Sequence, residues 1–218
     1  MRTSSFCLTV FCFTVVLCCG LLSGGAQAQD LYFPFEATVA SEGQTASFEG
    51  SALAHVLVDE DDHLLELQLT AEAGEVSLML SLLTRQRALA PGTYDAAASL
   101  GDIETIDDGF ADLPEDRFVT LAAFTTNPAI TRLRVASGTL TIHEVTPVHE
   151  VDDLPGGLTK EDVDEAPFTH VAHGSVTYEM ETPEGTAYNV TGSFRALETL
   201  QEAGAGDAPV HSHGGHAH

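Results

Sequence analysis

The chain has no tryptophan, four cysteines, and only eight lysine and arginine residues against 33 aspartate and glutamate residues. The four cysteines, Cys7, Cys12, Cys18 and Cys19, all lie within the first 28 residues, where a cysteine behaves as a small apolar side chain. Without that segment the chain has no cysteine. This excludes disulfides, thiolate catalysis and Cys-based zinc or iron–sulfur sites from the rest of the protein.

Basic residues are too few to form a stripe that could neutralise phosphates, so nucleic acid is excluded as a partner. The formal net charge is −25, and removal of Arg2 would leave seven basic against 33 acidic residues, a net charge of −26. Self-repulsion of this size is screened at high salt, where the Debye length falls to about 3 Å near 1 M. The near-absence of lysine is typical of proteins from salt-loving microbes; an ordinary acidic exported protein is the alternative.

The N-terminal segment predicts export. Arg2 precedes an apolar run at 6–22, and Ala26 and Ala28 give the small-x-small spacing of a signal-peptidase site before Gln29. We therefore expect a signal peptide at 1–28 and a mature chain that starts at Gln29, has no integral membrane span, and is periplasmic, cell-surface or secreted. The remaining 190 residues of the 218 fit one domain.

Two other interpretations of this segment are disfavoured. An uncleaved membrane anchor would need a longer uninterrupted apolar run than one broken by glycine at positions 20, 24 and 25. A lipoprotein anchor would use Cys18 or Cys19, but neither cysteine follows a small residue.

Alternating apolar and polar residues predict strands throughout the domain at 29–203. In EVSLMLSLL, for example, Val76, Leu78, Leu80 and Leu82 fall on one face. Strands are predicted at 35–40, 45–58, 64–70, 75–83, 118–124, 130–135, 138–145, 175–181 and 187–196, and turns at 71–74, 90–95, 127–128 and 182–185. The fold class expected is all-β, an antiparallel β-sandwich or open barrel with long acidic loops at 101–116 and 147–167 and little helix, the best place for a helical turn being 159–164.

Three strings near the C-terminus, GTLTIHEV, HGSVTYEME and NVTGSFRAL, carry a family resemblance. They resemble the C-terminal halves of small exported β-sandwich domains of unknown function, found in bacterial secreted proteins and lipoproteins. The resemblance covers about the last third of the domain. It implies a fold and an exported location, but no catalytic residues.

Motifs of known chemistry are mostly missing. His143 and His149 in HEVTPVH are six residues apart, whereas a zincin needs four, and we expect both on the surface. There is no G-x-S-x-G elbow or P-loop, and HGS at 173–175 is too short to identify a serine nucleophile. The acidic string at 107–116 does not have EF-hand spacing. Without tryptophan and with four tyrosines, the chain also lacks the aromatic platforms common in sugar-binding sandwiches.

The remaining candidate is the tail at 204–218, which we expect to be flexible. It ends in HSHGGHAH, so that His211, His213, His216 and His218 are separated only by small residues. Imidazoles bind zinc, copper and nickel, so these four histidines are the predicted metal site. The sequence thus predicts an exported acidic protein, not an enzyme, that binds a divalent transition metal. An interaction or structural module without ligand chemistry is the first alternative, and a hydrolase the second.

Overall fold

The structure is a computed structural model that describes residues 33–58, 63–97, 113–126, 129–151, 154, 159 and 168–202, with the backbone alone at 201 and 202. Apart from one 3-10 turn, η2 (Val148–Glu150), the regular elements in these ranges are strands. They are β1 (Pro34–Ser41), β2 (Gln44–Val58), β3 (His63–Ala73), β4 (Val76–Thr84), β5 (Gly92–Asp95), β6 (Val119–Thr126), β7 (Ala129–Pro147), β8 (Phe168–Glu181) and β9 (Ala187–Glu202).

Eight of the nine strands close into a barrel. Antiparallel pairing runs from β1 through β2, β3, β4, β6, β7, β8 and β9, and β9 pairs with β1 again. Strands β2 and β9 also pair directly and in parallel, past the point where β1 starts between them. This pairing runs from Leu53 opposite Leu197 to Val58 opposite Glu202. The extra strand, β5, pairs with the second half of β7, next to the stretch of β7 that pairs with β6. The prediction of an all-β antiparallel fold is confirmed. The strands form a barrel, and this barrel is closed.

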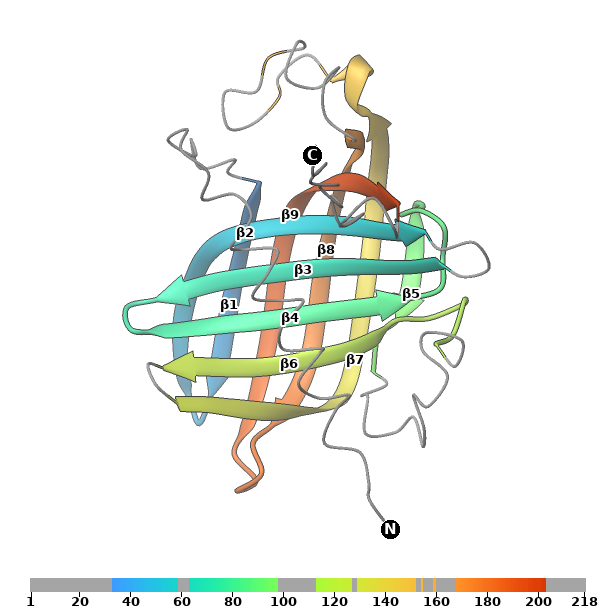
Figure 1. Ribbon diagram of the computed structural model, residues 1–218. Coiled ribbons are helices and arrows are strands. Elements are labelled where there is room, and N and C mark those ends of the chain that lie inside the picture. The colour runs from blue at the N-terminus through green and yellow to red at the C-terminus, as the bar shows by residue number, and fades with distance from the viewer. Residues whose placement is uncertain are drawn as a thin grey trace, which may run out of the picture.

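Figure 1 shows the barrel as two layers whose strands cross steeply. We call the first the β3–β4 layer, made of β3, β4, β6, the second half of β2 and the first part of β7. The second is the β8–β9 layer, made of β1, β8, β9, β5 and the rest of β7. The long strands β2 and β7 bend from one layer into the other (Figure 1). Strand β7 contains two bulges, with Ala136 and His143 as the extra residues.

The barrel interior is packed with apolar side chains. Alternation along each strand places one set of residues inside, including Phe35, Leu67, Leu80, Leu140 and Phe194. Tyr178 also lies inside and is 1% exposed. Its hydroxyl group lies 3.0 Å from the Thr120 hydroxyl group, which donates to the Ala96 carbonyl oxygen at 2.8 Å, so Tyr178 donates to Thr120. Burial raises the pKa of the Tyr178 hydroxyl group above its usual value. The described side chains that face the interior therefore form a packed core.

Two smaller apolar clusters cover parts of the outer surface. Val148, in the η2 turn, packs with Phe33, Val171 and Leu197 over the junction of β2, β8 and β9. Leu113 packs with Leu64, Leu83 and Val119 over β3, β4 and β6. The backbone carbonyl of Pro114, next to Leu113, accepts hydrogen bonds from the Arg85 amide at 3.1 Å and from the Thr84 hydroxyl at 2.9 Å. The end of the first acidic insertion is therefore anchored to the barrel.

Most predicted strands are present, but several of the predicted boundaries were wrong. The stretch at 90–95, predicted as a turn, contains strand β5. The two strands predicted at 130–135 and 138–145 are one continuous strand, because its bulges absorb the irregular register between them. Strand β8 starts seven residues before the predicted position, at Phe168, and β9 continues to Glu202. The predicted helical turn at 159–164 and the acidic string at 107–112 fall outside the described residues, except for Thr159.

Candidate functional site

The predicted metal ligands His211, His213, His216 and His218 lie outside the described residues. The last described strand, β9, ends at Glu202. At that end, Val58 of β2 is opposite both Glu202 and His63 of β3. His170 of β8 is opposite Glu198, four residues before the end of β9. The end of the barrel at which β9 ends therefore also carries His63 and His170.

The six other histidines are distributed over five elements. His143 lies in β7 and His149 in η2, and both are exposed, as the sequence predicted. His149 Nε2 lies 3.7 Å from Glu150 Oε1. His170 and His173 point to opposite sides of β8: His170 contacts a buried glutamate, and His173 is exposed. Within the described ranges, no group of three or more His, Cys, Asp or Glu side chains could hold a metal ion.

A buried carboxylate lies at the same end of the barrel, where β9 ends. The Glu198 side chain is 3% exposed and points inward, in phase with the core residues Phe194 and Ala196. Its Oε2 accepts the Leu89 amide at 2.8 Å. Its Oε1 accepts the Thr169 hydroxyl at 2.7 Å and faces His170 Nδ1 at 3.2 Å. Glu198 thus connects the segment before β5 to the start of β8, and its oxygens are occupied by protein donors.

The sequence prediction missed Glu198, although a signal for it was present. The strand was ended at Ala196, so Glu198 fell outside it. Continuing the two-residue alternation of Phe194 and Ala196 by one step would have placed an acidic side chain at an inward position, which requires hydrogen-bonding partners.

A row of polar side chains crosses the outer surface of the barrel between the two apolar clusters. His55 of β2 is opposite Thr199 of β9 and Glu66 of β3. His55 Nδ1 lies 2.9 Å from Thr199 Oγ1, and the Thr199 hydroxyl donates to the Ala54 carbonyl at 3.3 Å, which assigns the donated proton to Nδ1. Glu66 Oε1 accepts the Ser81 hydroxyl at 2.6 Å. Burial lowers the pKa of His55, and the Glu66 carboxylate offsets part of this effect.

The lowered pKa of His55 predicts a loss of stability in acid. Below its usual pKa of about 6.5, the imidazole is protonated more readily in the unfolded chain than in the folded barrel, so the free energy of unfolding falls as pH falls. We expect His55→Gln to give a shallower decline than wild type in urea unfolding series from about pH 7.5 to about pH 5.5. His149→Gln, which removes an exposed imidazole, is the matched control. Identical slopes for His55→Gln and wild type would show that His55 is not a source of the decline.

One histidine contacts a serine in the way a general base contacts a nucleophile. His143, the extra residue of the second β7 bulge, has its Nε2 3.1 Å from Ser175 Oγ on β8. A serine triad also needs a carboxylate on the other ring nitrogen. The adjacent Glu144 instead accepts the Thr146 hydroxyl at 3.2 Å. The described residues therefore contain a serine–histidine contact, which HGS did not reveal, but do not complete a triad.

The neighbouring His173 lies between groups of both charges. It is opposite Glu144 on one side and Arg195 on the other. Partial desolvation and the Arg195 guanidinium lower the pKa of His173, Glu144 raises it, and His143 lowers it further. The net effect is a lowered pKa, which favours the neutral form of His173.

Comparison with family models, with curated proteins and with solved structures finds no match for this chain. Among the described residues, no helix is both long enough and apolar enough to span a membrane.

Proposed function

We propose that this protein is exported and binds a divalent transition metal, zinc, copper or nickel, through His211, His213, His216 and His218. The observation that carries the proposal is four imidazoles within eight residues, separated only by serine, glycine and alanine. Two glycines among these residues allow the backbone to turn until several rings reach one ion. Imidazole nitrogen is a good ligand for each of these metals.

The barrel supports this proposal as a stable scaffold. Glu202, the last residue of β9, precedes His211 by nine residues, a length of chain that can span up to about 30 Å. The four histidines can therefore bind a metal away from the barrel surface, or approach His63 and His170 at the end where the chain emerges. Neither arrangement requires a change in the barrel.

Calorimetric titration with Zn²⁺ and with Cu²⁺ tests the proposal on protein purified without a nickel column. We expect the full chain to bind, with an affinity that collapses as pH falls through about 6.5, since imidazole must be neutral to coordinate a metal. Truncation after Pro209 should abolish binding and leave the melting temperature of the metal-free protein unchanged.

A second variant separates tail length from tail chemistry. Replacement of all four tail histidines by asparagine keeps the length and should also abolish binding. If either variant binds as tightly as the full chain, the site belongs to His143, His149, His170 or His173 instead. If the full chain does not bind, the first alternative, an interaction or structural module without ligand chemistry, takes its place.

A further inference from the structure

The outer face of the β8–β9 layer carries hydroxyl groups in rows that cross the strands. Strand register places these residues side by side, although they are up to 153 positions apart in the sequence. We call the two rows the hydroxyl face. One row is Thr139, Thr177, Thr191, Thr38 and Ser47, and the other is Thr93, Thr141, Ser175 and Ser193.

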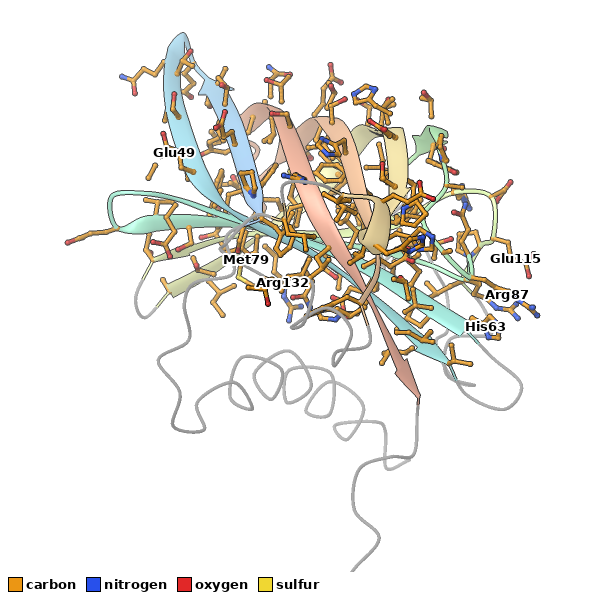
Figure 2. All side chains as sticks on the ribbon, turned by 90° about the horizontal axis from the view of Figure 1, so that it is seen from above. Glu49, His63, Met79, Arg87, Glu115 and Arg132 are labelled. Carbon is orange, nitrogen blue, oxygen red and sulfur yellow. The ribbon has the colours of Figure 1, made fainter. Side chains whose placement is uncertain are left out.

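A groove lies where the hydroxyl face reaches β9, β1 and β2. It has a volume of about 320 Å³, within the range of small-ligand sites. Four of its lining side chains, Thr38, Ser47, Thr191 and Ser193, belong to the hydroxyl face, and Glu36 and Glu49 add carboxylates. Glu36 is opposite Ser193 and Glu49 is opposite Glu36, so the two carboxylates continue the second row. Figure 2 shows Glu49 on the hairpin formed by β1 and β2, at a distance from Met79 and Arg132 of the β3–β4 layer.

The composition of this face is unusual for so acidic a protein. The chain has 33 acidic residues, and outward positions in exposed strands are the natural places for them. Yet the nine residues of the hydroxyl face are all uncharged, and most of them are exposed. A protein with a net charge of −25 repels an anionic polymer, whereas these nine residues carry no charge and the neighbouring carboxylates of Glu36 and Glu49 can accept hydrogen bonds from a neutral one.

The chemistry of the face and groove matches sugar hydroxyl groups. Each serine or threonine hydroxyl donates one hydrogen bond and accepts others, and carboxylates accept strong hydrogen bonds from hydroxyl donors. Neighbouring strands are about 4.8 Å apart, and residues two positions apart on a strand are separated by about 6.7 Å. An extended polymer with regularly spaced hydroxyl groups can therefore contact several of these residues at once.

We propose that the hydroxyl face and its groove bind an uncharged polysaccharide, with the groove holding sugar units through Glu36 and Glu49. This function does not depend on metal binding by the tail. It also does not need the aromatic platforms whose scarcity argued against sugar binding in the sequence, because hydrogen bonds from two strand rows take their place.

Affinity electrophoresis tests the proposal on the full chain in the presence of a chelator. Native gels containing dextran, mannan, xylan or hydroxyethyl cellulose should retard the protein in at least one case. We expect Thr177→Glu combined with Thr191→Glu to weaken retardation at least about tenfold, because hydrogen bonds are lost at the centre of the face and charge is introduced there. Glu36→Gln combined with Glu49→Gln, which leaves the face otherwise intact, should weaken it as well.

The control variant carries Thr70→Glu combined with Thr125→Glu, which adds the same charges to the β3–β4 layer. We expect its retardation to equal that of wild type. Mobility is compared with and without polysaccharide for each variant, which removes the effect of the added charge, and melting temperatures verify folding. Retardation by none of the four polymers would overturn the proposal. So would equal loss in the control variant, or stronger retardation by the anionic polymer alginate than by any neutral one.

Discussion

Glu198→Ala should lower the free energy of unfolding by about 3–5 kcal/mol, the effect typical of removing one partner from a buried, charged hydrogen-bond network. The Glu198 side chain is 3% exposed and accepts hydrogen bonds from the Leu89 amide and the Thr169 hydroxyl, with His170 at 3.2 Å. Alanine would leave these donors without their acceptor and would open a cavity at the end of the barrel. Urea unfolding monitored by circular dichroism measures the change.

Two further variants define the origin of this effect. Glu198→Gln keeps the shape and one acceptor oxygen, so its loss of stability should be smaller than that of alanine. Glu179→Ala removes an exposed glutamate from the neighbouring strand β8 and should change stability by no more than about 0.5 kcal/mol. If Glu198→Ala is as stable as Glu179→Ala, the carboxylate does not hold the barrel end together.

Gly50→Ala should destabilise the barrel by about 3 kcal/mol or more, at the upper end of the usual cost of overpacking. Gly50 lies in β2 between Phe35 of β1 and Ala71 of β3. A Cβ atom at this position would lie 2.0 Å from the Thr70 carbonyl oxygen and 2.6 Å from the Ala71 Cα atom. Both are backbone atoms, so the clash cannot be relieved by a side-chain rotation and the strands must separate.

The matched substitution is Ser51→Ala at the next position, where a Cβ atom is already present. It should change the unfolding midpoint only slightly. Soluble expression and thermal unfolding of the two variants give the comparison. If the Gly50→Ala protein has the same melting temperature as wild type, the close approach of β2 to β3 at this point is not required by the fold.

Secondary structure was predicted best where alternation is strong. The pattern at Val76, Leu78, Leu80 and Leu82 identifies β4, because residues two apart in a strand share a face. Strand β5 was missed because it has only four residues, Gly92–Asp95, and follows a proline, which resembles a turn. In β7, a bulge between Val135 and Ser137 shifts the alternation, so one strand looked like two.

The candidate sites also differ in whether the sequence alone reveals them. The histidine tail is visible in the sequence because its four histidines lie close together in the chain, and metal binding by them stays a prediction. The polar contacts of the barrel were not visible, because each joins distant segments: Glu198 is 109 residues from its donor at Leu89, and Ser175 is 32 residues from His143. Single-strand patterns do not specify which residues become neighbours across strands.

The sequence by itself determined the acidic character of the chain, the positions of its cysteines, the antiparallel all-β class and most strands, because these depend on composition and on local two-residue periodicity. Only the tertiary structure decided that the sheet closes, with β9 beside both β1 and β2, that Glu198 faces the interior, and that nine hydroxyl residues share one face. These features depend on strand register between residues far apart in the chain, which is fixed by packing of the whole barrel core and not by any local pattern.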